Sequence, residues 1–330
     1  MMNYSEFRSA FHKVLLIEFG DDYDINLTTV KKPNVGEMEA YNIVKGDVGA
    51  VVYVKNVYES YVQGRSIDEI AKNIASGIRD MDMVQSAFTD FTADDVYNKV
   101  YYKMVGINGN EEYLKDLPYI VPAGFDDIAL VPTIPVTVPG PNQTGSVKVT
   151  YSMMKSLDLD PEKLHACAEL NTEQMVRILP MSEVLFSGDP FTVPADEWKT
   201  TRSDFMFVAI GDRDASVLGA PRLMNEVYEI KGDHFIIPSS THEIIFATGQ
   251  IQEDIGYLKG MVSAVNGTLS PEDVLTDSVY ECRNGQVITH RGSSEQTGAS
   301  GAAGAAGNDF LASLLNPKDE GLASYGGPKL

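Results

Sequence analysis

The sequence has little of what marks secreted or membrane-spanning proteins. Two of its 330 residues are cysteines, Cys167 and Cys282, and so few thiols argue against a disulfide-rich scaffold. No apolar run reaches the ~18 residues that a bilayer span needs. Residues 1–8 lack the basic and apolar regions of a secretory signal. These absences predict a cytoplasmic protein.

Positive charge is also scarce. The chain has 26 Lys and Arg against 47 Asp and Glu, a formal net charge of −21. Binding to nucleic acid or to an anionic membrane depends on clustered cations, and the densest basic spot is the pair Lys31 and Lys32. We therefore expect no nucleic acid and no membrane partner. The oligomeric state stays open.

The familiar catalytic motifs are missing. The sequence contains no Walker A loop, no Gly-x-Gly-x-x-Gly, no His-Glu-x-x-His, no Gly-x-Ser-x-Gly and no Cys-x-x-Cys. This excludes the easily recognised nucleotide-binding, zinc-protease, α/β-hydrolase and redox classes, and it predicts no particular cofactor. Enzymes whose catalytic residues are scattered along the chain remain open.

Helix signals are clear in the first third of the chain. Asn3 and Glu6 form a capping box that predicts the first helix, and Ser66 and Glu69 form a second one before an amphipathic stripe. We expect another helix over residues 92–105.

Strand signals fill much of the remainder. Apolar or alternating segments predict strands at 37–44, 49–54, 127–138, 146–151, 235–237, 244–246, 278–282 and 286–290, the last two joined by an Asn284-Gly285 turn. The mixture predicts an α+β fold with mixed or antiparallel sheets and packed helices. We expect two lobes, 1–124 and 125–291, that meet near Gly124. Residues 292–330 read as a Gly/Ala-rich linker and a disordered tail.

One part of that tail has an apolar face at helical spacing. A short apolar face on a flexible tether suits docking into the groove of a protein partner. The alternative is an end that is disordered or that folds back on its own domain. The candidate partner-binding residues are Phe310, Leu311, Leu314 and Leu315.

A polar cluster interrupts two apolar strands at residues 239–243. One hypothesis makes Ser240 a nucleophile, His242 a base or ligand and Glu243 its charge partner. In an extended segment, however, His242 and Glu243 point to opposite faces. The alternative is that the hydroxyls cap a turn and that His242 bonds a backbone carbonyl.

Other candidates have plainer interpretations. A metal site at His242 would need His165, His234 or His290 to join it, and their spacing does not predict this. We expect Cys167, Tyr53, Tyr58, Tyr61 and Trp198 to be packing residues.

The segment 235–243, with Asp277-Ser278-Val279-Tyr280, resembles an uncharacterised bacterial family, the domain of unknown function number 5688. The similarity covers about residues 3–290, without 190–202 and the tail. Thr241 stands where that family often has Ile or Val. The resemblance implies no established activity.

The favoured hypothesis is a non-catalytic binding or adaptor protein. It follows from the missing motifs, the acidic composition and the tethered apolar tail. The alternative is a hydrolase or metal-assisted enzyme centred on the Pro-Ser-Ser-Thr-His-Glu segment.

Overall fold

The computed structural model describes residues 1–45, 48–82, 92–137, 144–186, 194, 196–201, 206–248 and 255–292. The helices of this part are α1 (Tyr4–Phe19), α2 (Val54–Val62), α3 (Ile67–Asp82), α4 (Ala93–Lys99), α5 (Glu111–Leu114), α6 (Tyr151–Ser156), α7 (Pro161–Met175), α8 (Met181–Phe186), α9 (Glu197–Thr200), α10 (Pro221–Lys231) and α11 (Ile255–Asn266). The strands are β1 (Asp24–Lys32), β2 (Gly36–Lys45), β3 (Val48–Tyr53), β4 (Tyr101–Gly106), β5 (Ile128–Thr137), β6 (Thr144–Lys148), β7 (Val176–Pro180), β8 (Met206–Gly211), β9 (His234–Pro238), β10 (Glu243–Thr248), β11 (Val279–Arg283) and β12 (Gln286–His290).

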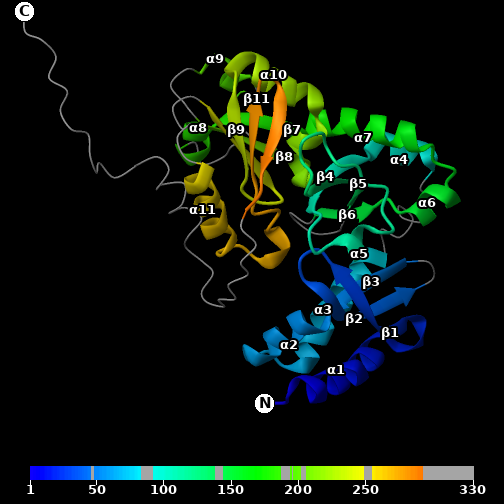
Figure 1. Cartoon of the computed structure of the whole chain (residues 1–330). Coiled ribbons are helices and arrows are strands. Elements are labelled where there is room, and N and C mark those ends of the chain that lie inside the picture. The colour runs from blue at the N-terminus through cyan, green and yellow to red at the C-terminus, as the bar shows by residue number, and fades with distance from the viewer. Residues whose placement is uncertain are drawn as a thin grey trace, which may run out of the picture.

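The described strands form three antiparallel sheets (Figure 1). Their orders are β1-β2-β3, β4-β5-β6 and β12-β11-β9-β10-β8-β7. Helices pack on these sheets, so the predicted α+β class with antiparallel pairing is confirmed.

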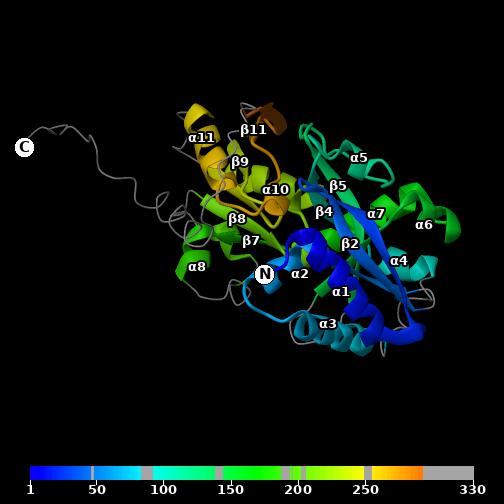
Figure 2. The ribbon, with the colours of Figure 1, turned by 90° about the horizontal axis from the view of Figure 1, so that it is seen from below.

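The N-terminal unit joins β1-β2-β3 to helices α1, α2 and α3, which lie together in Figure 2. Asn3 and Glu6 make the predicted capping box, and the side chain of Ser66 accepts a hydrogen bond from the N–H of Glu69 before α3. Residues of α1 spaced by four, Phe7, Phe11 and Leu15, are fully buried against the other elements. This unit therefore has a hydrophobic core of its own.

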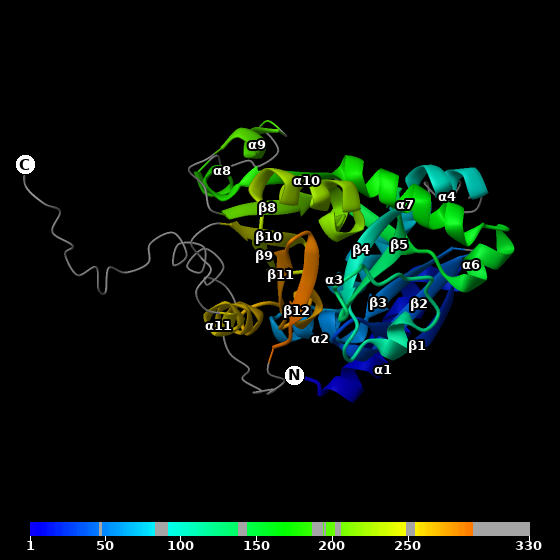
Figure 3. The same cartoon turned by 45° about the horizontal axis from the view of Figure 1, so that its top comes forward.

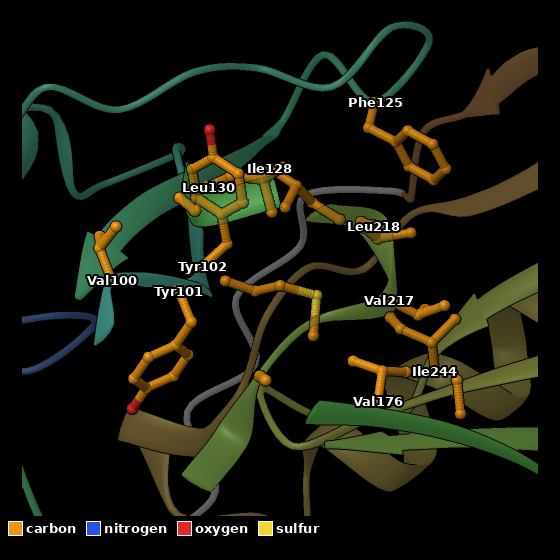
Figure 4. Packing of buried hydrophobic residues seen from close by; sticks show 14 of the residues in the cluster. Val100, Tyr101, Tyr102, Phe125, Ile128, Leu130, Val176, Val217, Leu218 and Ile244 are labelled. Atoms are coloured by element: carbon orange, nitrogen blue, oxygen red, sulfur yellow. The ribbon is translucent and has the colours of Figure 1, made fainter. Parts of the chain in front are cut away.

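The other two sheets share a second, larger core. It takes residues from α4, β4, β5, α7 and one face of the six-stranded sheet. Figure 3 shows α7 and α10 along one side of these sheets, and Figure 4 shows Tyr102, Ile128 and Leu130 in this core. The opposite face of the six-stranded sheet packs on α11 through residues such as Phe235 and Ile237. Burial on both faces explains why β8, β9 and β10 are almost continuously apolar.

The helix expected over 92–105 is wrong in its second half. Helix α4 ends at Lys99, and β4 follows from Tyr101 and pairs with β5. The segment after Lys99 is rich in aromatic and branched residues, which fit a pleated sheet as well as a helix face. Pairing with β5 decides between the two.

The structure leaves two sequence predictions untested: the domain boundary at Gly124 and the docking role of the C-terminal tail. The predicted boundary at Gly124 falls between β4 and β5, two paired strands that contribute to one core, and the division at this residue stays a prediction. Phe310, Leu311, Leu314 and Leu315 lie outside the described residues, so their docking role also stays a prediction.

Within the described part of the chain, no helix has both the length and the apolarity to cross a bilayer.

The N-terminal core generates a direct stability test. Phe11 is fully buried, whereas Ile17 on the same helix is 79% exposed. We expect Phe11→Ala to lower the free energy of unfolding by about 3–5 kcal/mol, the usual cost of deleting a buried aromatic ring. Ile17→Ala should change it by less than about 0.5 kcal/mol. Chemical denaturation followed by circular dichroism measures both, and equal effects of the two substitutions would contradict the assignment of the core.

Candidate functional site

A cavity of about 330 Å³ lies where the three sheets approach one another. Its floor is one face of β4-β5-β6. Its walls come from the β1–β2 turn, the end of β3, helix α5 and the loops at one end of the six-stranded sheet. We call it the inter-sheet cavity. It draws on segments from residue 30 to residue 273, so it depends on the whole described fold.

Strand alternation explains the polar floor of the cavity. Tyr102 and Met104 point into the large core, so Lys103 between them faces the other way. In register across the sheet, Lys103 pairs with Val131, and Thr133 pairs with Lys148. Lys103, Val131, Thr133 and Lys148 therefore lie on one face and line the cavity.

Four lysines line this cavity: Lys31 and Lys32 from β1, Lys103 from β4 and Lys148 from β6. The ammonium of Lys31 lies 3.4 Å from the Glu112 carboxylate. The ammonium of Lys32 lies 2.9 Å from the Glu272 carboxylate, and that of Lys103 lies 2.8 Å from Asp214. Lys148 differs, because among the described residues it has no carboxylate partner. Its Nζ lies 5.0 Å from the centre of the Tyr113 ring. Enclosure by the cavity walls lowers the pKa of Lys148, and the nearby Lys103 and Lys32 charges lower it further.

His242 bridges two carboxylates at the cavity wall. Its Nδ1 lies 2.8 Å from an oxygen of Asp214, and its Nε2 lies 3.1 Å from an oxygen of Asp273. The hydrogen bond to Asp214 is the main cause that raises the pKa of His242 to about 9, and the same contact helps to lower the pKa of Asp214. At neutral pH the imidazole is therefore a cation that donates from both nitrogens.

The backbone around Asp214 is strained. Arg213 and Asp214 both adopt positive φ, 54° and 64°, which costs non-glycine residues roughly 1–3 kcal/mol each. The Tyr101 hydroxyl donates to the Arg213 carbonyl at 3.0 Å, while Lys103 holds the Asp214 side chain. Gly211 is required nearby, because a Cβ there would lie 1.9 Å from the carbonyl oxygen of Ala215. This strained turn directs Asp214 toward both Lys103 and His242.

The β1–β2 turn closes another side of the cavity. Asn34 has a φ of 59°, and its N–H donates to the Asn110 side chain at 2.7 Å. The Asn110 amide returns a hydrogen bond to the Asn34 side chain, which in turn donates to the Val274 carbonyl. Together with the Lys32–Glu272 ion pair, these contacts fasten the N-terminal sheet over the cavity.

The structure separates the three residues of the catalytic hypothesis. The Ser240 hydroxyl accepts from the backbone N–H of His242 at 3.1 Å, as expected of a turn cap. The Glu243 carboxylate accepts from Ser239 at 2.8 Å, away from the imidazole. His242 bonds carboxylates instead of the backbone carbonyl expected in the alternative interpretation. A catalytic role for Ser240, His242 and Glu243 stays a prediction.

The remaining histidines lie elsewhere. His165 bonds the Tyr102 hydroxyl, His234 bonds the Gly232 carbonyl, and His290 bonds Glu281. Across the described residues, no group of three His, Cys, Asp or Glu side chains could hold a metal ion. At His242 the reason is geometric, since its two carboxylate partners lie on opposite ring nitrogens.

Of the five residues expected to serve in packing, four lie in or against a hydrophobic core and one lines the inter-sheet cavity. Trp198 is buried in the large core, and Cys167 packs against that core. Tyr58 and Tyr61 pack against the N-terminal core. Tyr53 lines the inter-sheet cavity, with Lys32 Nζ 4.3 Å from its ring centre.

A second hollow of about 650 Å³ lies beside residues 274–278. Its buried charge, Asp127, accepts hydrogen bonds from the hydroxyls of Thr276, Ser278 and Tyr280. That carboxylate is already satisfied and serves to join β5 to β11, so we place the site in the inter-sheet cavity.

The sequence analysis singled out His242 as a candidate, and it did not predict the two carboxylates that the structure places beside it. Asp214 and Asp273 lie 28 and 31 residues away from it, and no local pattern links them. One usable signal was present: Ser146 and Lys148 are polar at alternate positions of a predicted strand, which indicates a polar sheet face.

Comparison with known proteins identifies a family. A protein-family model described as a family of unknown function (DUF5688) matches residues 4–283 and confirms the resemblance seen in the sequence. No curated protein and no solved structure matched the chain.

The bridge at His242 predicts an unusual titration. In one NMR experiment on the histidine side chains, we expect His242 to titrate near pH 9 and His165 and His234 below their ordinary value of 6.5, because burial lowers their pKa. Asp214→Asn should lower the pKa of His242 and leave the other two unchanged. A His242 that titrates near 6.5 in the wild type would contradict the bridge.

The same pair predicts how stability depends on pH. A pKa raised from 6.5 to about 9 gives a stabilisation that is fully present below about pH 6.5 and is lost as pH rises through 9. Because His242 is half exposed, we expect a contribution of about 1 kcal/mol or less. The melting temperature of the wild type should therefore fall more between pH 6.5 and 9.5 than that of His242→Gln. Parallel curves for the two proteins would refute this.

Proposed function

We propose that this chain, which belongs to the DUF5688 family of unknown function, is a non-catalytic binding protein whose inter-sheet cavity holds a small organic anion. The family brings no activity with it, so the proposal depends on the cavity alone.

The convergence of four lysines is the observation that carries the proposal. Lys31, Lys32, Lys103 and Lys148 line one cavity in a chain of net charge −21. Burial lowers the pKa of Lys148, and repulsion from the like charges of Lys103 and Lys32 lowers it further. An anionic ligand would relieve that repulsion, which favours its binding in this cavity.

The cavity also limits the kind of anion. Its volume of about 330 Å³ is at the small end of ligand sites. Tyr53 and Tyr113 offer aromatic walls, and the buried Tyr113 hydroxyl has no hydrogen-bond partner among the described residues. Thr133 and Ser146 add hydroxyls. This lining suits a small carboxylate or phosphate compound with a flat or apolar part.

The state of His242 favours binding over catalysis. A general base needs a nitrogen with a free lone pair at the working pH. Both nitrogens of His242 face carboxylates, and its pKa of about 9 keeps it protonated. In this proposal His242 is a fixed positive charge that holds Asp214 and Asp273 in place.

Anion binding can be measured by isothermal titration calorimetry with pyrophosphate and with citrate, which separate phosphate from carboxylate recognition. We expect the wild type to bind at least one of them, more weakly as salt rises. Lys148→Gln should weaken binding about tenfold or more, since a hydrogen bond to a charged group contributes ~1.5–3 kcal/mol.

Lys72→Gln is the matched control, because Lys72 is exposed on α3. It removes the same charge far from the cavity and should bind as the wild type does. Equal losses in both variants would mean that net charge, and not the cavity, governs binding. Failure of both anions to bind the wild type would sink the proposal.

A further inference from the structure

We propose that Lys148 is a nucleophilic amine that forms an imine with anionic carbonyl compounds, of the 2-oxo acid or phosphorylated aldehyde class, in the inter-sheet cavity. This deepens the proposed function and rests on it, because the same cavity must first bind the anionic part of the compound.

Lys148 is not held by an ion pair as its neighbours Lys32 and Lys103 are. The ammonium groups of Lys32 and Lys103 are held by Glu272 and Asp214 at 2.9 and 2.8 Å. No carboxylate of the described residues forms such an ion pair with Lys148. Its side chain retains contact with solvent within the cavity, beside the face of Tyr113. The amine is therefore accessible, and no carboxylate of the described residues pairs with it.

Reaction at Lys148 also depends on its protonation. An ammonium has no lone pair, so a lysine attacks a carbonyl only in its neutral form. Enclosure by the protein and the charges of Lys103 and Lys32 lower the pKa of Lys148 and enlarge that neutral fraction. Desolvation and a neighbouring cation are the two known means of activating a lysine for imine formation.

The activating groups can also bind the ligand. The charges of Lys32 and Lys103 are placed to attract a carboxylate or phosphate. That attraction would bring an attached carbonyl group to Lys148, whereas a neutral carbonyl compound would have no such help. The chemistry therefore selects a compound that carries both an anion and a carbonyl.

The reaction balances without a further reagent. The nitrogen lone pair of Lys148 attacks the carbonyl carbon and forms the C–N bond as the C=O π bond breaks, and one proton passes from the nitrogen to the former carbonyl oxygen. The resulting carbinolamine loses water, and a C=N bond forms, so amine and carbonyl give imine and one water molecule. The ring of Tyr113 lies beside the amine, and burial raises the pKa of its hydroxyl, which therefore stays protonated.

The test is chemical trapping on the full chain. Protein is incubated with pyruvate or with pyridoxal 5′-phosphate and cyanoborohydride, which reduces an imine to a stable secondary amine. Peptide mass spectrometry then gives the rate of modification at each lysine. We expect Lys148 to react several times faster than exposed Lys72, because its lowered pKa leaves more of the amine neutral and the cavity holds the anionic reagent beside it. Pyrophosphate should slow the reaction at Lys148 alone.

Two controls decide the interpretation. Acetone, a neutral ketone, meets the same amine but is not attracted by Lys32 and Lys103, so its preference for Lys148 over Lys72 should be smaller than that of pyruvate; equal selectivity with acetone and pyruvate would overturn the requirement for an anion. Lys148→Arg keeps the positive charge but forms no trappable imine, so labelling in the cavity should disappear while calorimetric anion binding persists.

The outcomes also distinguish imine formation at Lys148 from anion binding in the cavity. Equal labelling of Lys148 and Lys72 in a protein that binds pyrophosphate or citrate would overturn the imine and leave anion binding intact. Equal labelling in a protein that binds neither anion would overturn both.

Discussion

The alternation of side chains along β4, β5 and β6 is the constraint on which the rest of this molecule depends. One face of this small sheet supplies Tyr102, Met104 and Leu130 to the large core. The opposite face must then present Lys103 and Lys148. Charged groups cannot be packed against a dry apolar layer without a large desolvation cost. The neighbouring elements therefore meet this face with carboxylates, hydroxyls and tyrosines, and a cavity remains between them.

Asp214 connects that sheet to the rest of the site. It accepts from Lys103 on the floor and from His242 on the wall, and His242 reaches on to Asp273. The chain Lys103–Asp214–His242–Asp273 alternates in charge, so each group is stabilised by the next. A change at any member alters the electrostatics of all four. The raised pKa of His242 and the lowered pKa of Asp214 are two signs of the same coupling.

Much of the fold could be predicted from the sequence because its signals are local. The capping box at Asn3, the stripe of α3 and the Asn284-Gly285 turn each lie within a few residues, and the structure confirms all three. The segment 92–105 was harder, since its apolar residues suit a helix or a strand and distant pairing with β5 decides the outcome. Local sequence patterns thus predict helices, strands and turns well where only one type of element fits them.

The site could be predicted only in fragments. The segment around His242 stood out because polar residues interrupt apolar strands, and the separation of His242 from Glu243 followed from strand geometry. Its true partners come from other loops, and the positive φ values of Arg213 and Asp214 had no signal in the sequence. Convergence of this kind is a property of the tertiary structure.

The position of the site also follows from where the molecule departs from local preference. Sequences usually satisfy propensity, burial and charge pairing together, and departures tend to gather at functional sites. Here two consecutive strained residues, four neighbouring lysines and a buried tyrosine hydroxyl without a described partner all occur around one cavity. Asp127, by contrast, is a buried charge with every feature of a structural one, since three hydroxyls satisfy it. Several departures from local preference thus gather around the inter-sheet cavity, and a ligand that neutralises its lysines would stabilise the folded protein.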